Sequence, residues 1–339
     1  MSDWPCGFLD GPAAEVLRSY GMLCPDQSVL TLGNRGGFSG ARLWKVGDGV
    51  GACCLRAWPP GDPTPERLSW IHGLMRRGRE RGLDFVPAVA RTAQGTTWIA
   101  HGGRLWDVIA WMPGQADFQE QPTPARLDAA CMALARLHGA WAGVDPVQGP
   151  CPGIGRRLRI AQEWIHIIES GWCPEFEEQE TDPVLPWAQR AWTLFQSRIG
   201  SVPRTLATWR DRAFLLHPCL CDIWHDHVLF EGDRVSGLID YGGVKVDHCA
   251  VDLARLLGSL VEDNADRRDA GLNAYLRCRP LSWEEQALVG VLDETGAVIA
   301  VANWLNWLYR DGKTYEDRTA VARRLAKVVQ RLEKGKSPV

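Results

Sequence analysis

The sequence predicts an α+β protein with two lobes, an antiparallel sheet with one helix followed by a larger and mostly helical part. Two patterns carry this prediction. Residues 28–112 contain short β-rich runs separated by turns rich in glycine and proline. After Gly114 apolar residues recur at helical spacing, apart from one strand–turn–strand pattern at 227–241. A chain of 339 residues can build two hydrophobic cores, and we expect one lobe over 1–112 and the other over 113–339.

The N-terminal elements follow one another along the chain. Residues 12–24 predict a short opening helix, and three strands follow in SVLTL, ARLWKV and ACCLRAW. A proline-rich linker leads into ERLSWIHGLMRRGRERG, which predicts a helix because its apolar residues recur at helical spacing at Leu68, Ile71, Leu74 and Met75. FVPAVAR, TTWIAH and RLWDVIAWMPG have the residue pattern of further strands. Together these elements predict one small sheet with one long helix beside it.

Beyond Gly114 the predicted elements are helices, with one exception. ARLDAACMALARLHGAW, GRRLRIAQEWIHIIESG and LPWAQRAWTLFQSRIG have helical spacing of their apolar residues. HVLFEGDRVSGLIDY predicts a β-hairpin, because a Gly-Asp turn separates two β-rich runs. ALVGVLDETGAVIAVANWLNWLY and TAVARRLAKVVQRLEK then return to helical spacing. The second lobe is therefore predicted to be helical and to carry one hairpin.

Composition argues against several classes of function. The formal net charge of −3 offers no broad basic surface, so we expect neither nucleic acid nor a membrane as partner. The start of the chain lacks the pattern of a signal peptide, and the apolar stretch AVIAVANWLNWLY is too short to span a bilayer. The 11 Cys include no pair of Cys-x-x-Cys motifs, which disfavours a structural zinc site and favours a reduced, cytoplasmic protein.

Aromatic and acidic residues leave two interpretations open. The 17 Trp are typical either of core packing or of an aromatic-walled pocket for a cationic small-molecule acceptor. The acidic run PEFEEQETD at 174–182 is either a solvated loop or part of such an acceptor site. The sequence alone does not indicate an oligomeric state.

The stretch CLCDIWHDHVLFEGDRVSGLIDYGG at 219–243 carries a resemblance. It is similar to the catalytic segment of the aminoglycoside phosphotransferase/choline kinase family, relatives of the protein kinases, in which His-Gly-Asp-x-x-x-x-Asn precedes a hairpin and an Ile-Asp turn. Asp222 stands at the Asp of that motif, His227 at its Asn, and Asp240 follows thirteen residues later. AVDLARLL resembles the Asp-Leu-Ala helix of the family, and LARLH at 134–138 resembles the helix before its catalytic loop.

The resemblance implies a bilobal protein-kinase-like fold with a five-stranded antiparallel sheet. It implies transfer of the γ-phosphoryl group of ATP to a hydroxyl of a small molecule, as in aminoglycoside, choline or homoserine kinases. Such a transfer needs a carboxylate to orient the hydroxyl and a metal ion to neutralise the phosphates. Asp222 would be the catalytic base and Asp240 the chief Mg²⁺ ligand. His227 would be an unusual second ligand, with Mn²⁺ as an alternative ion, because imidazole is softer than Mg²⁺ prefers.

The N-terminal lobe would then bind ATP. The glycine-rich stretch LGNRGGFSGARLWKV would cover the phosphates through Gly36, Gly37, Phe38 and Ser39. In the family a strand Lys contacts the phosphates and pairs with a helix Glu. Here the matching strand has Arg56, for which Glu66 is the nearest candidate partner in the sequence. The segment IAWMPG would meet adenine around Trp111 and Met112.

Two alternatives stay open. Asp222, His225, Asp226 and His227 are the residue types of a metal-dependent hydrolase, although neighbouring residues on a strand point to opposite faces. The departures at His227 and Arg56 also fit a catalytically impaired pseudokinase, which binds nucleotide as a scaffold or regulator.

Overall fold

The structure, a computed structural model, describes residues 11–22, 28–33, 40–176, 182–315 and 317–334. It divides into two compact units, and each is described by itself. Unit 1 comprises Met1–Trp141 and Asp226–Val244, and unit 2 comprises Ala142–His225 and Lys245–Val339. Unit 1 thus contains a helix and a hairpin that lie beyond residue 112, and the lobe boundary at 112/113 stays a prediction.

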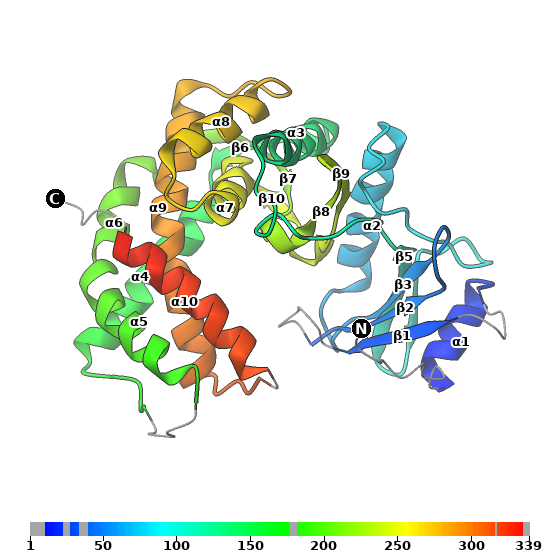
Figure 1. The fold of residues 1–339 in the computed structure, drawn as a ribbon, viewed down its shortest axis with the longest axis horizontal. Helices are drawn as coiled ribbons and strands as arrows, with labels where there is room; N and C mark the ends of the chain where they lie inside the picture. Colours follow the sequence, from blue (N-terminus) through cyan, green and yellow to red (C-terminus); the bar gives the residue numbers. More distant parts are fainter. Residues whose placement is uncertain (1–10, 23–27, 34–39, 177–181, 316, 335–339) are drawn as a thin grey trace. The chain divides into compact units, whose positions relative to one another are not determined.

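Unit 1 is built on a five-stranded antiparallel sheet (Figure 1), which confirms the predicted sheet. The strands run in the order β1-β2-β3-β5-β4. Their bounds are Val29–Gly33 for β1, Arg42–Val46 for β2, Cys53–Ala57 for β3, Trp98–His101 for β4 and Arg104–Ala110 for β5. The predicted strand FVPAVAR is wrong, because it forms only the bridge between Val89 and Ile109. Pro87 has no N–H to donate to a strand ladder, which disfavours a strand there.

Two helices accompany the sheet, and both were predicted. Helix α1 (Gly11–Ser19) contributes Val16 and Leu17 to a core shared with Leu55 and Val108 of the sheet. Helix α2 (Pro65–Glu80) begins where the Thr64 side chain accepts a hydrogen bond from the Arg67 N–H. Its buried face includes the predicted residues Leu68, Ile71, Leu74 and Met75 together with His72.

The rest of unit 1 is helix α3 (Pro124–Trp141) and the hairpin of β8 (Val228–Glu231) and β9 (Arg234–Leu238), both as predicted. The chain after β5 packs on this hairpin, since Gln115 and Phe230 exchange both of their backbone hydrogen bonds. Gly114 has φ +93°, and a Cβ there would lie 2.3 Å from the Ser236 Oγ. Only glycine fits this approach of the two segments.

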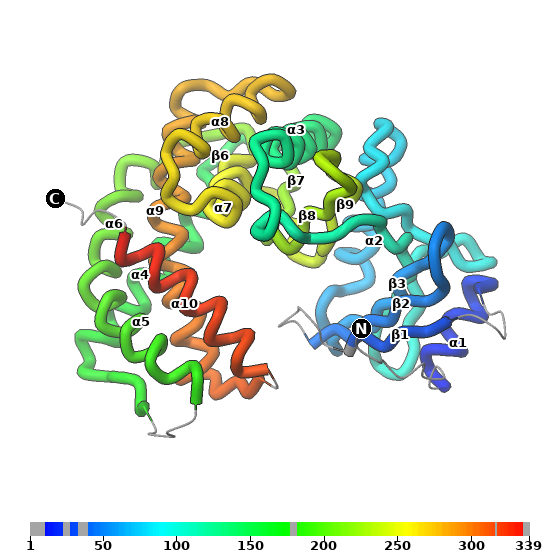
Figure 2. The backbone as a smooth tube through the Cα atoms, in the orientation of Figure 1, coloured from blue at the N-terminus to red at the C-terminus, as the bar shows by residue number. Residues whose placement is uncertain are grey.

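Unit 2 is mostly helical, and the tube in Figure 2 traces its helices from green to red. The helices are α4 (Pro152–Glu169), α5 (Leu185–Arg198), α6 (Ser201–Leu206), α7 (Ala250–Leu260), α8 (Ala265–Leu276), α9 (Trp283–Leu305) and α10 (Arg318–Lys334). Unit 2 also holds a three-stranded antiparallel sheet in the order β10-β7-β6, which the sequence did not predict. Its strands are β6 (Val147–Pro150), β7 (Ala213–Cys219) and β10 (Lys245–Asp247). Strands β6 and β10, of four and three residues, give too short a pattern to recognise.

Helix α9 corrects one expectation. It begins at a capping box of Ser282 and Glu285 and continues through a π-helical turn at Asn306–Arg310. Over Trp283–Arg310 it is long and apolar enough to cross a membrane, so the expected shortness was wrong. However, 61% of its apolar window is buried inside the structure, and α9 contacts α4, α5, α6, α7 and α10. This burial is that of a core helix.

Candidate active site

The loop that carries Asp222 follows strand β7 and is held by helix α7. The backbone N–H groups of Leu220 and Cys221 each donate to one carboxylate oxygen of Asp252, at 2.6 Å. Asp252 is fully buried in the first turn of α7. Burial raises the pKa of Asp252 to about 7, while the two N–H donors act to lower it. Cys221 adopts φ 61°, so the chain turns sharply just before Asp222.

Helix α7 also contacts the Asp222 side chain itself. Arg255, three residues after Asp252, forms an ion pair with the Asp222 carboxylate through Oδ1. The two side chains are 46% and 50% exposed, so this pair borders water. The same helix holds the end of the loop, since the His225 N–H donates to the Ser259 Oγ at 3.0 Å. One helix therefore positions the whole loop around the predicted base.

In unit 1 the structure brings His227 and Asp240 together. The His227 Nε2 lies 3.7 Å from the Asp240 Oδ2. The backbone helps to set this distance, because the His227 carbonyl accepts a hydrogen bond from the Ile239 N–H at 3.0 Å. Asp240 adopts a left-handed conformation with φ 60°, and its Oδ1 accepts from the Gly242 N–H at 3.3 Å. His227 is 8% exposed, whereas the Asp240 carboxylate is half-exposed.

The donor set of His227 and Asp240 fits a divalent cation. Two ligand atoms that each lie about 2.1 Å from one ion are at most about 4.2 Å apart, which the 3.7 Å between Nε2 and Oδ2 satisfies. The half-exposed carboxylate leaves room for water and phosphate oxygens as further ligands. A carboxylate with an imidazole suits Mn²⁺ at least as well as Mg²⁺.

Arg56 is paired with Asp107 and not with Glu66. The Arg56 Nε and Nη2 donate to the two Asp107 oxygens at 3.1 and 2.8 Å. The two residues stand directly opposite each other on β3 and β5, which explains why they meet. Glu66 is exposed in the first turn of α2, and the expectation that it pairs with Arg56 is wrong.

A histidine from helix α2 completes this buried group. The His72 Nε2 lies 2.9 Å from the Asp107 Oδ2, and its Nδ1 lies 2.9 Å from the Thr97 Oγ1. Asp107 has no exposed surface. Burial alone would raise the pKa of Asp107, but Arg56 and His72 hold that pKa well below its usual range. Arg56, Asp107 and His72 are called the buried relay below.

Trp58 connects Arg56 to the Asp240 turn. The Arg56 guanidinium lies 3.7 Å from the centre of the Trp58 ring. A Cβ added to Gly242 would lie 3.2 Å from the other edge of that ring. The Arg67 Nη2 donates to the Gly242 carbonyl at 2.8 Å. The candidate phosphate-binding cation and the candidate metal ligand Asp240 are thus parts of one packed region of unit 1.

The structure describes only some of the other residues that were predicted to contact the nucleotide. Gly36, Gly37, Phe38 and Ser39 lie outside the described residues. Trp111 is 37% exposed, and the Lys45 Nζ lies 5.3 Å from the centre of its ring. Met112 is buried against Gly237 of β9. The proposed roles of all these residues in binding adenine or phosphates stay predictions.

The tryptophans that the structure describes in unit 2 include a packed core cluster. Trp164, Trp172, Trp192 and Phe195 lie with ring centres between 5.2 and 6.4 Å apart. This geometry supports the core-packing interpretation for these rings. Residues 177–181 of the acidic run lie outside the described residues. Asp182 at its end is bonded to Arg318.

Sequence reasoning missed four residues that build this region: His72, Asp107, Asp252 and Arg255. Asp107 did leave a signal, because it is the one carboxylate in the strand RLWDVIA and has apolar neighbours on both sides. A lone charge in a buried strand requires a partner, and the opposite strand supplies Arg56. Asp252 and Arg255 lie in the quoted motif AVDLARLL, but the motif alone does not show that they face the catalytic loop.

The comparisons with known proteins give the family. The model of the phosphotransferase enzyme family matches residues 32–288. A homoserine kinase of Rhodopseudomonas palustris is 35% identical over 252 residues, covering 70% of this chain and 69% of the relative. A homoserine kinase of a Bradyrhizobium species is 27% identical over 255 residues and covers 70% of each chain. The chain belongs to the phosphotransferase enzyme family.

Solved structures share the fold at low identity. Spectinomycin phosphotransferase in complex with ADP and spectinomycin has a TM-score of 0.66 at 9% identity, over 91% of this chain and 92% of that one. Amicoumacin kinase in complex with AMP-PNP, Ca²⁺ and its substrate has a TM-score of 0.60 at 14% identity, over 93% and 91%. These likenesses confirm the predicted fold class.

The predicted class of enzyme is confirmed as well. The protein is a small-molecule kinase, which transfers a phosphoryl group from ATP to a hydroxyl. The family settles the choice against a metal-dependent hydrolase. Residues 225–227 form a 3-10 turn and not the strand on which that alternative was judged.

Proposed function

We propose that Asp222 is the catalytic base of this kinase. The observation that carries the proposal is the double anchoring of its loop by helix α7, through Asp252 on the backbone and Arg255 on the side chain. A carboxylate on a loop fixed in this way can accept the proton of an acceptor hydroxyl without reorganising. Arg255 keeps the carboxylate oriented until a substrate hydroxyl arrives.

Substituting Asp222 by Asn tests this role. The amide keeps the shape of the side chain but cannot accept the proton, so we expect kcat to fall about 10²–10⁴-fold. Affinity for ATP, measured by calorimetry, should stay within a few-fold of the native value. A variant with full kcat would remove Asp222 from the reaction, and a variant that lost ATP affinity in proportion would assign it to binding.

We propose that Asp240 and His227 hold the divalent cation, either Mg²⁺ or Mn²⁺. When bound there, the ion would neutralise charge on the ATP phosphates. The pair His227 Nε2 and Asp240 Oδ2, 3.7 Å apart, supports this role. His227→Asn should shift the preference from Mn²⁺ toward Mg²⁺, because an amide oxygen is the harder ligand. An unchanged ratio of Mn²⁺ to Mg²⁺ affinity would show that His227 does not touch the ion.

We propose that Arg56 contacts the ATP phosphates with the part of its guanidinium that Asp107 leaves open. Asp107 takes the Nε and Nη2 hydrogens that point to its carboxylate. The proposed covering loop, Gly36 to Ser39, and the linker residues Trp111 and Met112 would complete the nucleotide site. ATP and GTP, compared by kcat/KM, will show which base that linker accepts.

We propose an amino alcohol as the phosphoryl acceptor. Homoserine kinases support this class, since a relative at 35% identity carries that name. An aminopropanol kinase of the same fold, with a TM-score of 0.58, fits the same chemical class. A panel of homoserine, aminopropanol, choline and glycerol, compared by kcat/KM, tests it. Homoserine or aminopropanol should exceed glycerol by at least about tenfold, since a charge-assisted hydrogen bond to the ammonium contributes about 1.5–3 kcal/mol. Equal use of glycerol would contradict the proposal.

We also propose a cytoplasmic location. In the described part of the chain nine cysteines have free thiols, as expected in a reducing compartment. Fractionation of cells that produce the protein would test this directly.

A further inference from the structure

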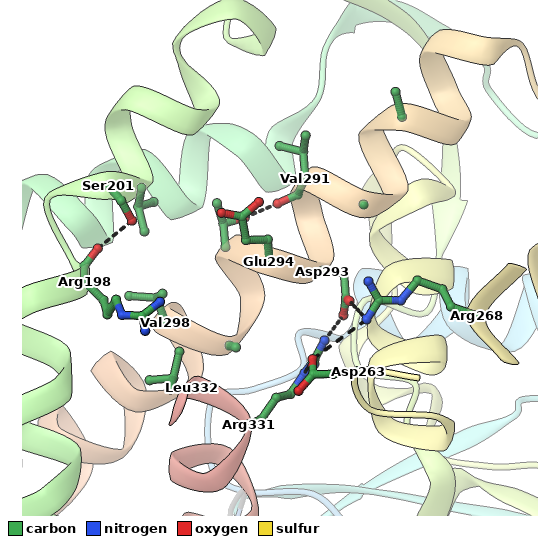
Figure 3. Close-up of a pocket in the computed structure, with 15 residues that line it drawn as sticks. Arg198, Ser201, Asp263, Arg268, Val291, Asp293, Glu294, Val298, Arg331 and Leu332 are labelled. Atoms are coloured by element: carbon green, nitrogen blue, oxygen red, sulfur yellow. Dashed lines mark hydrogen bonds and ion pairs between the residues drawn. The ribbon is translucent and has the colours of Figure 1, made fainter. Parts of the chain in front are cut away.

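Each unit contains a cavity, and the two cavities differ in the charge of their lining residues. The cavity of unit 2, about 550 Å³, lies among α6, α9 and α10 (Figure 3). Its charged groups already neutralise one another, since Asp293 accepts from Arg268 at 2.7 Å and from Arg331 at 2.5 Å. Asp263 lies a further 3.4 Å from the Arg331 Nε. The described lining holds three arginines and three carboxylates, so a ligand would meet no net formal charge there.

The cavity of unit 1 is lined by an excess of positive charge. It measures about 480 Å³ and lies between α2 and the segment 88–98. Arg76 and Arg79 of α2 and Arg91 of that segment all line it, and the described residues that line it include no carboxylate. Arg91 bonds only the Gly95 carbonyl among the described residues, at 2.8 Å. The size is typical of a small-molecule site.

The ion pairs of these arginines outside the cavity are weak. Arg76 lies 3.4 Å from Glu80, and both side chains are more than half exposed. Arg79 lies 3.5 Å from an exposed Asp84 carboxylate and donates to the Asp84 carbonyl at 2.9 Å. Exposed pairs of this kind contribute about 0–1 kcal/mol, so they do not prevent the guanidinium groups from binding another anion.

The helix leaves space for a ligand at this place. Gly73 of α2 lines the cavity, and a Cβ added to it would meet nothing within 4 Å. Glycine inside a helix costs about 1 kcal/mol relative to alanine, so its presence here lowers the stability of α2 without a packing reason. The Trp98 ring lines the same cavity, and its Nε1 donates to the Ser69 Oγ at 2.8 Å.

We propose that this cavity binds a small phosphate monoester. Three guanidinium groups, each with a planar fork of donors, match a phosphate dianion better than a singly charged carboxylate. The Thr96 and Thr97 side chains and Trp98 line the space where the organic part would lie. A kinase that phosphorylates an alcohol releases a phosphate monoester, so molecules of this class are formed wherever the enzyme works.

The occupied cavity would act on the ATP site through the buried relay. His72 lines the cavity, and its two ring nitrogens bond Thr97 and Asp107. Asp107 in turn holds Arg56. A ligand that moves Thr97 or His72 would therefore change the position of Arg56 through the hydrogen bonds of His72 and Asp107. This coupling rests on the proposed role of Arg56 in binding phosphates, whereas the cavity's affinity for phosphate monoesters does not.

Calorimetry without nucleotide tests the site. O-phosphoserine and glycerol 3-phosphate are titrated into the full-length protein, with serine, glycerol and sulfate at equal ionic strength as comparison ligands. We expect both phosphate esters to bind at least tenfold more tightly than sulfate, and the free alcohols not to bind. Gly73→Leu, which fills the cavity, and Arg91→Gln should each weaken binding at least tenfold. Arg18→Gln, at an exposed position of α1, is the matched control and should leave binding unchanged.

Two results would overturn the proposal. One is the absence of binding, and the other is binding that Gly73→Leu and Arg91→Gln leave intact, which would place the anion in the ATP site. Thermal unfolding of both variants shows whether they are folded, and Arg91→Gln decides the question if Gly73→Leu is not. The KM for ATP should change at least threefold with glycerol 3-phosphate in the native protein and not in Arg91→Gln. Binding without that change would overturn the coupling alone.

Discussion

Two arginine–aspartate pairs serve opposite purposes in this enzyme. In unit 1 the Arg56–Asp107 pair is 8% and 0% exposed, and His72 closes it on the remaining side. In unit 2 the Asp222–Arg255 pair is about half exposed on both sides. A buried pair that has lost its water cannot exchange partners cheaply, whereas an exposed pair can. The first pair thus fixes the Arg56 cation in place, whereas the second leaves the Asp222 carboxylate accessible to water and, in its proposed role as base, to a substrate hydroxyl.

Removing Asp107 should produce the largest effect. Asp107→Ala leaves Arg56 buried without a counter-charge, so we expect the free energy of unfolding to fall by about 3–5 kcal/mol. Denaturant unfolding at neutral pH measures this. The double variant Arg56→Met with Asp107→Leu is the control, because it removes both charges and should recover most of the loss. A single variant as stable as the native protein would show that the pair is not sealed from water.

Weakening the anchor of the catalytic loop should produce the next largest effect. In Asp252→Asn one oxygen is replaced by an NH₂ group, which leaves a buried backbone N–H without an acceptor at a cost of about 1–3 kcal/mol. We expect kcat to fall roughly 10–100-fold, because Asp222 loses its fixed position. ATP affinity should be little changed. If kcat and stability both stay at the native level, α7 does not position the loop.

Removing Arg255 tests how much the exposed Asp222–Arg255 pair contributes to stability. Since both partners border water, Arg255→Ala should change the free energy of unfolding by only about 0–1 kcal/mol. Its effect should appear instead in catalysis, as a lower kcat and a shifted pH profile. Arg159→Ala, at an exposed position of α4, is a matched control for the loss of a surface arginine. Destabilisation as large as that of Asp107→Ala would remove the contrast between the two pairs.

A third pair, between those two in exposure, should report on acid stability. His248 and Glu285 are 3.0 Å apart, with Glu285 partly exposed. The hydrogen bond from His248 lowers the pKa of Glu285 from 4.5 to about 2, against the opposing effect of burial. A lowered carboxyl pKa stabilises the fold above pH 4.5, and this stabilisation is lost as the pH falls toward 2. The difference in stability between the native protein and Glu285→Gln should therefore shrink over this interval. A constant difference from pH 6 to 2 would contradict the shift.

The sequence predicted the sheet, the long helices and the hairpin because each has a local repeating pattern. It also predicted that His227 and Asp240 belong together, since a hairpin of known length joins them and the structure places them 3.7 Å apart. It could not predict that Arg56 binds Asp107, because 51 residues separate the two and their meeting depends on the strand register. The small sheet of unit 2 was missed for the same reason, because its strands β7 and β10 are distant in the sequence and pair only in the folded chain.

The strand-to-strand geometry of Arg56 and Asp107 has a mechanical consequence. An arginine whose ion-pair partner lies on a helix loses that partner when the helix moves away. Movement of the helix can then switch the site between an intact and a broken ion pair. Here both partners belong to neighbouring strands of one sheet, and that pairing survives any displacement of α2. Helix α2 reaches the pair through the His72 ring, which bonds Asp107. Movement of α2 would therefore shift the position of Arg56 gradually, and it would not break the ion pair between Arg56 and Asp107.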